Sequence, residues 1–513
     1  MTRTQASLKN LITAFIGQAA GILISFIARR AFLDCLDEQY LGISGLFSNI
    51  LTVLSLAELG VGSAMTFALY KPLAENDVPL IKSLMGLYKR AYNAIGAAVL
   101  VLAVIFVPVY PWFMDEVPDI PHLTAIYLLY AANTGVSYFF TYKRTLIICD
   151  QKRYVATAYH YSFFLVLNIA QIAVLYATKN YLLFTAAQLL FTILENIAVS
   201  MAANKMYPYL KEKDVLPLPE AVLGDIKKNV GAMLMHKIGG IVVLSTDNIL
   251  ISKLVGIAST GIYSNYYLIT NALEKVINQV FTSMSAGVGN LNAEDEDKSK
   301  LMTSFYRVFF MNFWVIGFSF VCLVCLFNPF ICLWLKNDSL TFGMDTVVLI
   351  SAVFFLTGMR KTVLTYREAA GAFYYDRYKP IAESLVNIIA SVALARVMGV
   401  SGIFLGTVIS TLTVCIWVEP YVLFKHVFKA SPKKYFLRLL LYTAVTGAVC
   451  ALTYFICGLI TIASPLWNFI ARALVSILLL NIIFLALFGR SEEFKFFRKL
   501  LWDIISGKLR KKS

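Results

Sequence analysis

Long apolar runs recur along the whole chain, and short polar segments separate them. A helix that crosses a bilayer needs about 20 mostly apolar residues. Fourteen runs have about this length: 10–33, 41–69, 91–113, 122–148, 154–177, 181–203, 229–254, 261–290, 304–327, 343–366, 380–399, 402–424, 437–458 and 465–488. Open strands cannot cross lipid, and these runs are too long for the strands of a barrel. The pattern therefore predicts an all-α polytopic membrane protein with about 14 transmembrane helices.

The composition agrees with this pattern. The chain is 59% hydrophobic and only 15% charged, whereas a soluble domain has roughly 45–50% apolar and 25% charged residues. One soluble core could not bury so much apolar surface, so the lipid bilayer must be part of the solvent. The net charge of +15 would suggest a nucleic-acid partner in a soluble protein. Here the position of the charge along the chain explains it, and we expect no nucleic-acid partner.

The basic residues follow the loops between the runs. With the N-terminus in the cytoplasm, most of the 45 Lys and Arg residues fall in segments that face the cytoplasm, as the positive-inside rule requires. The predicted outer loops are richer in acidic residues, such as Asp115, Glu116 and Asp119. The first run ends at Arg29 and Arg30 without a cleavage pattern, so we expect it to be retained. The prediction is a multi-pass protein with both termini cytoplasmic.

A polar linker at 204–228 divides the first twelve runs into six and six. This division predicts an N-terminal six-helix lobe at 1–203 and a C-terminal six-helix lobe at 229–425, followed by two additional transmembrane helices within 437–488. In the basic tail at 489–513, apolar residues recur at helical spacing. That spacing is typical of an amphipathic helix that lies on the cytoplasmic membrane surface.

The two lobes show a weak internal repeat. A shift of 219 residues aligns Lys9-Asn10 with Lys228-Asn229, Gly21-Ile22 with Gly240-Ile241, and Gly42-Ile43 with Gly261-Ile262. The shared offset favours duplication over chance. An even number of helices in each copy makes both copies run the same way, which predicts two pseudo-symmetric lobes about an axis along the membrane normal.

The sequence carries no pattern of an enzyme. It has no Gly-rich phosphate loop ending in Lys-Ser/Thr, and its four histidines are scattered without metal-binding spacing. Its eight cysteines lie in or near apolar runs, and the C-x-x-C pair Cys322 and Cys325 has no histidine nearby. Core packing is therefore favoured over metal or redox chemistry for these thiols. We expect a membrane transporter with no catalytic residues, no metal and no cofactor.

Charges inside the apolar runs are the candidates for function, because such residues are costly in lipid and usually face a cavity or a partner. Arg29 and Arg30 are adjacent in the first run. Because successive residues differ by about 100° on a helix, both cannot comfortably face lipid. Two guanidinium groups would suit a diphosphate through paired hydrogen bonds. The alternative is that both side chains reach the outer interface, helped by Asp34 and Asp37.

The second half adds four more candidates. Lys237 lies near the middle of its run, and Asp247 follows ten residues later. Ten residues span about 15 Å of helix, which is too far for a direct ion pair between these two. Glu274 and Lys275 lie within one long run, and we expect one of them to face a cavity. The alternative for this set is internal ion pairing that only rigidifies the bundle, and for Glu58 of the second run a helix contact is as plausible as a site.

The first hundred residues also carry a family pattern. Its elements are Arg29-Arg30, the segment from Tyr40 to Phe47, the segment from Leu56 to Ala64, and Leu69-Tyr70-Lys71-Pro72-Leu73-Ala74. With these residues the chain resembles the Wzx-type polysaccharide flippases of the multidrug/oligosaccharidyl-lipid/polysaccharide (MOP) exporter superfamily. The resemblance covers most of the chain, is strongest over 10–100, and is a diffuse pattern rather than a sharp motif.

The resemblance implies a function. It implies two six-helix lobes in the bacterial cytoplasmic (inner) membrane and a cargo of undecaprenyl-diphosphate-linked oligosaccharide. The cargo would pass from the inner to the outer leaflet for cell-surface polysaccharide biosynthesis, by alternating access through a cationic central cavity. Glycosyltransferases and a polysaccharide polymerase would then be partner enzymes. In the lipid II flippases, relatives with fourteen spans, arginine in the first span lines the cavity, which matches Arg29 or Arg30.

Two other hypotheses stay open. A cation-coupled multidrug antiporter of the same fold would need an acidic site, such as Asp247 or Glu58, although the cationic bias of the first, seventh and eighth runs argues against it. A membrane scaffold for polysaccharide assembly would transport nothing.

Overall fold

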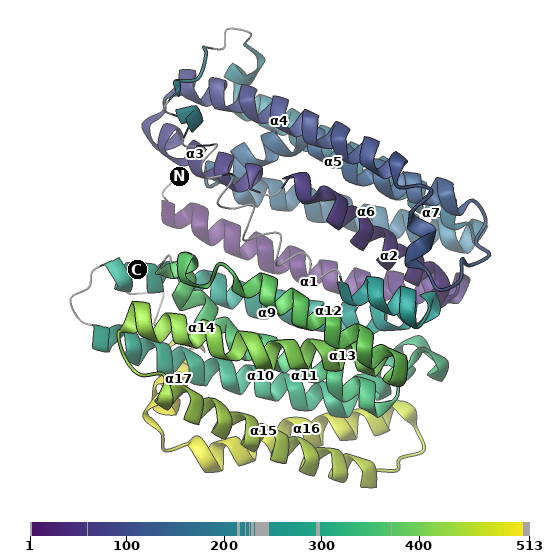
Figure 1. Ribbon diagram of the computed structural model, residues 1–513, viewed down its shortest axis with the longest axis vertical. Helices are drawn as coiled ribbons and strands as arrows, with labels where there is room; N and C mark the ends of the chain where they lie inside the picture. Colours follow the sequence, from purple (N-terminus) through teal and green to yellow (C-terminus); the bar gives the residue numbers. More distant parts are fainter. Residues whose placement is uncertain are drawn as a thin grey trace. The chain divides into compact units, whose positions relative to one another are not determined.

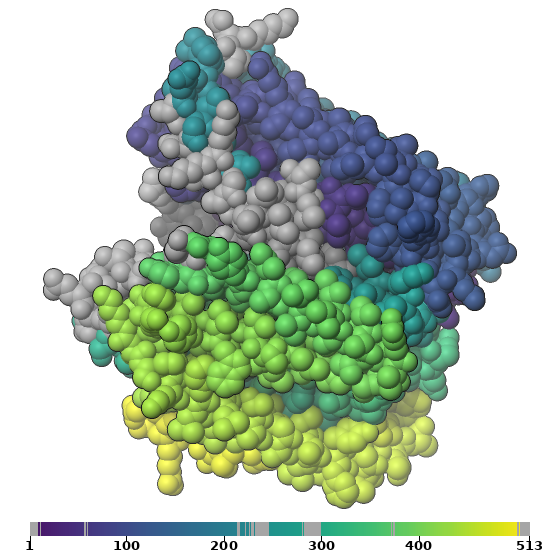
Figure 2. All heavy atoms as spheres, viewed as in Figure 1, coloured from purple at the N-terminus to yellow at the C-terminus, as the bar shows by residue number. Residues whose placement is uncertain are grey.

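A computed structural model describes residues 3–58, 60–212, 216–220, 222–224, 226, 230, 246–293, 298–370 and 372–505. The remaining residues are grey in Figures 1 and 2. The chain forms two compact units, unit 1 at Met1–Gly261 and unit 2 at Ile262–Ser513. Within the described residues every regular element is a helix, which confirms the all-α fold class.

Unit 1 begins with a long helix and continues with helices that pack on it and on one another (Figure 1). Its helices are α1 (Arg3–Cys35), α2 (Glu38–Leu54), α3 (Val61–Glu75), α4 (Val78–Ile105), α5 (Leu123–Cys149), α6 (Arg153–Thr178) and α7 (Tyr181–Met206). A further helical segment at 246–254 leads to the first turn of α9 (Ile257–Ala293), and α9 then continues into unit 2.

Side-chain caps determine where several of these helices begin. Asp37 accepts a hydrogen bond from the Gln39 amide at 3.1 Å at the start of α2. Asp77 accepts from the Leu80 amide at 3.0 Å at the start of α4, and Asn180 accepts from the Leu182 amide at 2.9 Å at the start of α7. Each cap satisfies an amide that has no partner inside its own helix.

Unit 2 contains the remaining helices. They are α10 (Lys298–Leu335), α11 (Met344–Ala369), α12 (Lys379–Met398), α13 (Val400–Ser410), α14 (Ile416–Val422), α15 (Lys433–Leu459), α16 (Pro465–Phe488) and α17 (Glu492–Ile505). π-helical turns at Thr411–Cys415 and Leu423–Phe428 join α13 and α14 into one continuous rod and extend it. The last two long helices, α15 and α16, pack against α10 (Figure 1).

Ten helices in the described part of the chain are long and apolar enough to cross a membrane, and each corresponds to a predicted run. The other four predicted runs have different outcomes. The runs 122–148 and 261–290 form α5 and α9, which are helical but less apolar. Most of the run 229–254 lies outside the described residues.

The run 41–69 was expected to be one helix, and this expectation is wrong. α2 ends at Leu54, a 3₁₀ turn occupies Ser55–Glu58, and α3 begins at Val61. Gly60 caps α3 with a φ of 98°, a conformation that side chains other than glycine rarely adopt. The next helix, α4, begins at Val78 and ends at Ile105 rather than spanning the predicted 91–113.

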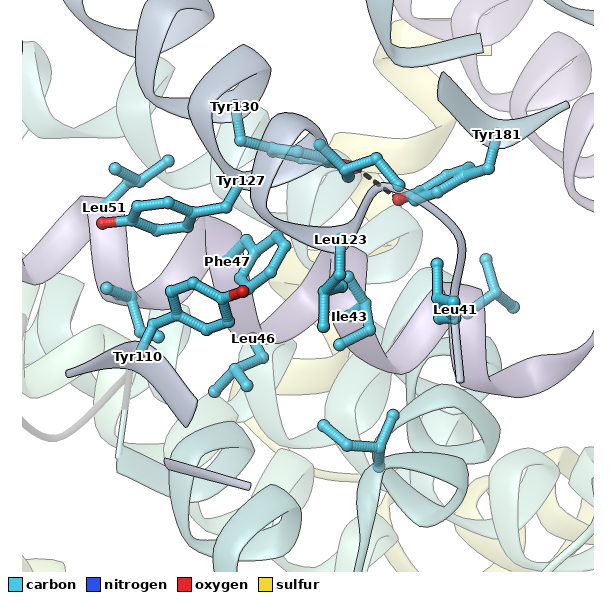
Figure 3. Packing of buried hydrophobic residues seen from close by; sticks show 14 of the residues in the cluster. Leu41, Ile43, Leu46, Phe47, Leu51, Tyr110, Leu123, Tyr127, Tyr130 and Tyr181 are labelled. Carbon is cyan, nitrogen blue, oxygen red and sulfur yellow. Dashed lines mark hydrogen bonds between the residues drawn. The ribbon is translucent and has the colours of Figure 1, made fainter. Parts of the chain in front are cut away.

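Each unit has an aromatic core. In unit 1 the Phe47 ring is fully buried, with its centroid 5.3 Å from that of Tyr110 and 5.1 Å from that of Tyr127 (Figure 3). In unit 2 Phe313 of α10 stacks on Tyr442 of α15 with centroids 4.0 Å apart. Edge-to-face and stacked rings add about 0.5–1.5 kcal/mol per pair beyond the burial of their area. These contacts attach α15 to the rest of unit 2.

Candidate functional site

Unit 1 contains a cavity of about 330 Å³ between α2, α5, α7 and the turn that follows α2. Every side chain that lines it carries a hydroxyl, amide or carboxylate group. The lining residues are Ser48, Thr52, Ser55, Glu58, Tyr130, Asn133, Thr134, Tyr138 and Gln188. Polar groups inside a membrane-embedded bundle are costly, and they usually mark a path or a site for a substrate or an ion.

The break after α2 builds one wall of this cavity. Ser55 lies at the last turn of α2 and donates to the Leu51 carbonyl at 2.7 Å. Glu58 ends the 3₁₀ turn, and its Oε1 accepts a hydrogen bond from the Tyr92 hydroxyl of α4 at 2.7 Å. This bond orients the carboxylate in the wall, and the positive φ of Gly60 lets the chain turn into α3 directly afterwards.

The hydroxyl groups in the wall present acceptors to the cavity. Thr52 donates to the Ser48 carbonyl at 2.7 Å, and Thr134 donates to the Tyr130 carbonyl at 3.0 Å. Such bonds within one helix use the O–H group and leave lone pairs on the hydroxyl oxygen. The Oδ1 atom of Asn133 is buried and has no hydrogen-bond partner among the described residues.

A pair of tyrosines connects the cavity to Arg29. The Tyr130 hydroxyl donates to Ser44 Oγ at 2.8 Å and lies 2.9 Å from the Tyr181 hydroxyl (Figure 3). The half-buried Arg29 of α1 interacts electrostatically with both tyrosines. Tyr130 also lines the cavity, so Arg29 interacts with one residue of the cavity wall. Of the sequence candidates, Glu58 lines the polar cavity itself, and Arg29 interacts with Tyr130 of its wall.

Arg30 has different surroundings. It interacts electrostatically with Tyr176 of α6, whose hydroxyl is 3.2 Å from Oδ2 of Asp34 and whose side chain is exposed. The separation follows from helix geometry, because neighbouring residues diverge by about 100°. Arg30 thus interacts with the group at the end of α1 that includes Asp34, and its role in binding a substrate stays a prediction.

The four candidates from the second half are distributed as follows. Lys237 lies outside the described residues. Asp247 is half-buried in the helical segment 246–254 of unit 1. In α9, Glu274 is half-buried and interacts electrostatically with Lys361 of α11, whereas Lys275 is exposed. The structure thus brings Glu274 to a cation of α11 within unit 2.

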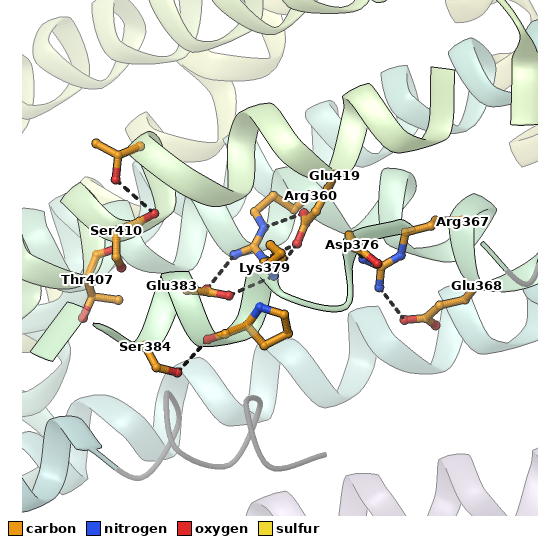
Figure 4. Close-up of polar contacts among 12 residues, drawn as sticks. Arg360, Arg367, Glu368, Asp376, Lys379, Glu383, Ser384, Thr407, Ser410 and Glu419 are labelled. Atoms are coloured by element: carbon orange, nitrogen blue, oxygen red, sulfur yellow. Dashed lines mark hydrogen bonds and ion pairs between the residues drawn. The ribbon is translucent and has the colours of Figure 1, made fainter. Parts of the chain in front are cut away.

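Unit 2 also holds a buried cluster of four charges, shown in Figure 4. Arg360 of α11 donates to both carboxylate oxygens of Glu419, at 2.9 and 2.6 Å. Lys379 of α12 lies 2.7 Å from Glu419 and 2.8 Å from Glu383, and Arg360 lies 3.7 Å from Glu383. Glu419 is completely buried. Two cations balance two carboxylates, so this cluster joins three helices and leaves no net charge for a ligand.

Sequence reasoning missed the cavity because none of its residues except Glu58 is charged. A signal was present in α5, where Tyr130, Thr134 and Tyr138 recur at intervals of four and so share one face of the helix. In the described part of the chain, no group of three or more His, Cys, Asp or Glu side chains is placed to hold a metal ion. The eight cysteines are free thiols, and five of them are buried.

No protein-family model matches the chain, and no curated protein matches it either. Solved structures do. The lipid II flippase MurJ in an inward closed conformation superimposes with a TM-score of 0.63 at 16% identity, over 96% of this chain and 99% of the flippase.

Two multidrug-transporter structures are also similar. An inward-facing multidrug resistance MATE family transporter of the MOP superfamily matches with a TM-score of 0.61 at 14% identity, over 79% of this chain and 94% of its own. A mutant form of the Vibrio cholerae MATE transporter VcmN matches with a TM-score of 0.56 at 13% identity, over 83% of this chain and 99% of its own. The chain therefore has the fold shared by a lipid II flippase and MATE transporters of the MOP superfamily.

Proposed function

We propose that this protein is a flippase for undecaprenyl-diphosphate-linked oligosaccharide. It moves its cargo from the inner to the outer leaflet of the bacterial cytoplasmic membrane, for cell-surface polysaccharide biosynthesis. The observation that carries the proposal is Arg29, a cation of a helix long and apolar enough to span a membrane, which interacts electrostatically with Tyr130 in the wall of the polar cavity of unit 1. The fold likeness to a lipid II flippase, over nearly the whole of both chains, supports a lipid-linked cargo.

The chemistry of the cargo matches this arrangement. A diphosphate carries negative charge close to the membrane. A guanidinium offers it planar, paired hydrogen bonds, and the guanidinium itself stays charged at any physiological pH. The polar cavity gives the hydrophilic part of the cargo a path that lipid does not offer, while the isoprenoid tail stays in the bilayer. Alternating access between two lobes would then carry the head group across. Both termini are proposed to be cytoplasmic.

The test is flipping in proteoliposomes. Lipid-linked oligosaccharide with a fluorescent group on its sugar is supplied in one leaflet, and a membrane-impermeant quencher reports its arrival in the other. The Arg29→Gln variant is expected to reduce the flipping rate at least about tenfold, because a charge-assisted hydrogen bond is worth about 1.5–3 kcal/mol. Arg30→Gln is expected to reduce the flipping rate less, since Arg30 interacts with the exposed Tyr176 and not with Tyr130 of the cavity wall.

Arg396→Gln is the matched control, because Arg396 is an exposed arginine of another membrane-spanning helix. Melting curves in detergent must show that all variants are folded. A full flipping rate in Arg29→Gln would contradict the role of this arginine. Wild-type protein that does not accelerate flipping at all would contradict the proposed function itself.

A second function has one specific observation in its favour. Glu58 places a carboxylate in the cavity of unit 1, as a cation-coupled multidrug antiporter would require, and two of the similar structures are MATE transporters. This hypothesis predicts uptake of a lipophilic cation into proteoliposomes when a proton or sodium gradient is applied, and loss of that uptake in Glu58→Gln. Gradient-driven uptake of the cation without flipping of lipid-linked sugar would favour the antiporter.

A further inference from the structure

We infer that the polar cavity of unit 1 is a carbohydrate subsite, which holds the part of the glycan nearest the diphosphate. The inference rests on the proposed function and adds to it which part of the cargo enters this cavity. Three observations carry it: the chemistry of the lining, an unsatisfied buried acceptor in a lining residue, and Tyr130, which lines the cavity and also interacts with Arg29.

The lining suits a neutral ligand with many hydroxyl groups. Pockets for drug-like molecules are lined mainly by hydrophobic and aromatic side chains, with few polar groups. Here all nine described lining residues carry polar atoms, and Glu58 is the only one among them with a formal charge. A site for phosphate would need cations in its wall. A sugar can instead donate to Glu58 and to threonine oxygens, and it can accept from the amides of Asn133 and Gln188.

Tyr130 and Tyr138 contribute the remaining property of a sugar site. Both residues line the same cavity, eight residues apart on one face of α5. A pyranose has one face made of C–H groups and an edge made of hydroxyl groups. An aromatic ring covers the first while polar side chains bond to the second, so the lining matches both surfaces of one sugar ring.

Asn133 is the most direct sign of a missing partner. Its Oδ1 is buried without a hydrogen-bond partner among the described residues, and Asn133 is one of the residues that line the polar cavity. An unsatisfied buried acceptor costs about 1–3 kcal/mol. A sugar hydroxyl that donates to this oxygen would recover that cost on binding, so Asn133 is expected to contribute to affinity for the glycan.

The size and position of the cavity determine which part of the cargo enters. Its volume of about 330 Å³ lies at the small end of ligand pockets, too small for an entire oligosaccharide. Tyr130 both lines the cavity and interacts with Arg29. If Arg29 holds the diphosphate, the sugar bound beside Tyr130 is the one that follows the diphosphate in the cargo.

The experiment compares two lipids in nanodiscs: polyprenyl diphosphate with its glycan, and the same polyprenyl diphosphate without sugar. Asn133→Leu and Gln188→Leu, which keep side-chain size but remove the polar atoms, are tested for equilibrium binding of each lipid. We expect affinity for the glycosylated lipid to fall about tenfold, and affinity for the bare lipid to change less than about twofold. Gln39→Leu, at an exposed glutamine of α2, is the matched control.

Each result decides between the hypotheses. An equal loss of affinity for both lipids, or no loss for either, would overturn the carbohydrate subsite. Wild-type protein that binds both lipids equally well would overturn the subsite and leave the proposed function standing. Wild-type protein that binds neither lipid would overturn the proposed function, and the subsite with it. Thermal unfolding of each variant shows whether a loss of binding comes from misfolding.

Discussion

Gly42 of α2 and Gly261 of α9 make equivalent contacts with each other's helix. A Cβ atom on Gly42 would collide with the main-chain oxygen of Ile257, and a Cβ atom on Gly261 would collide with the main-chain oxygen of Glu38. The 219-residue shift that relates the two halves of the sequence aligns Gly42 with Gly261 and also Glu38 with Ile257. All four residues belong to unit 1, and the reciprocal contact supports the internal repeat.

This contact predicts that larger residues are not tolerated at either glycine. Gly42→Leu and Gly261→Leu are each expected to destabilise the protein by about 1–3 kcal/mol, because a side chain must push two backbones apart. The two losses should be similar in size, since the contacts are equivalent. The measurement is thermal unfolding in detergent. Gly447→Leu is the control, because nothing lies within 4 Å of its added Cβ; unchanged melting of the first two variants would contradict the contact.

The charge cluster of unit 2 predicts a large loss of stability when one of its carboxylates is replaced by an uncharged amide. Glu419→Gln leaves Arg360 and Lys379 facing one carboxylate, that of Glu383, in a buried site. Removing one partner of a buried ion pair lowers the free energy of unfolding by about 3–5 kcal/mol, because the other charge is left buried without its partner. Glu75→Gln, which removes an exposed pair with Lys71 at 3.9 Å, should cost at most about 0.5 kcal/mol. Chemical or thermal unfolding in detergent measures both.

A double variant separates charge balance from simple loss of packing. Arg360→Met with Glu419→Met removes one cation and one anion together, and it leaves Lys379 paired with Glu383 at 2.8 Å. Replacing a buried pair with apolar residues of similar size is often neutral or stabilising. The double variant should therefore be more stable than Glu419→Gln alone, and a double variant that is less stable would show that the cluster contributes through something other than charge balance.

Attachment of α17 is predicted to depend on pH. Burial of Glu493 opposes its ionisation, but hydrogen bonds, including one of 2.7 Å from Arg438 of α15, and the nearby Lys434 together lower its pKa below the ordinary 4.5. A carboxylate with a lowered pKa stabilises the folded state above the unfolded pKa, and this contribution is lost as pH falls through the folded pKa. The α17 contact should therefore weaken progressively below pH 4.5.

Amide hydrogen exchange of α17, corrected for the intrinsic effect of pH, measures this weakening. In Glu493→Gln the protection of α17 should be lower at neutral pH and should change less on acidification. The Phe494 ring, stacked on Trp314 of α10 with centroids 5.3 Å apart, should hold part of the contact in both proteins. Equal acid sensitivity of the variant and the wild type would assign the effect to another group.

The exposed side of α17 is predicted to bind anionic lipid. Lys495, Arg498, Lys499 and Trp502 are all exposed, and at about 100° per residue they share one sector of the helix, next to the side on which Phe494 contacts α10. Cations with an interfacial tryptophan are typical of a surface that rests on negatively charged head groups. Amide exchange in α17 should be slower in nanodiscs with anionic lipid than in neutral ones.

The triple variant Lys495→Gln, Arg498→Gln and Lys499→Gln should lose this difference between the two lipid compositions. The matched control removes three other exposed cations, Lys71, Lys89 and Arg90, and should keep it. High salt should reduce the difference in the wild type, because surface attraction is screened. Slow exchange that is the same in neutral and anionic nanodiscs would show that α17 is held by the protein alone.

The sequence by itself determined the fold class and most of the membrane-spanning helices. Ten predicted runs form helices long and apolar enough to cross a membrane in the described residues, because hydrocarbon accepts only helices of sufficient length and apolarity, and that demand is visible residue by residue. It also made Arg29 a candidate for the site, since a charge in an apolar run is conspicuous. Lys237 remains a prediction, because it lies outside the described residues.

Only the tertiary structure decided which polar groups meet. Glu58, Asn133 and Gln188 come from three separate segments, and they form one cavity only because α2 breaks after Leu54 and packs near α5 and α7. Arg360 and Lys379 were not among the candidates from the sequence, yet both lie beside the buried Glu419. Hydrophobic periodicity records how a helix meets lipid, whereas the partners of its polar residues depend on which helices become neighbours.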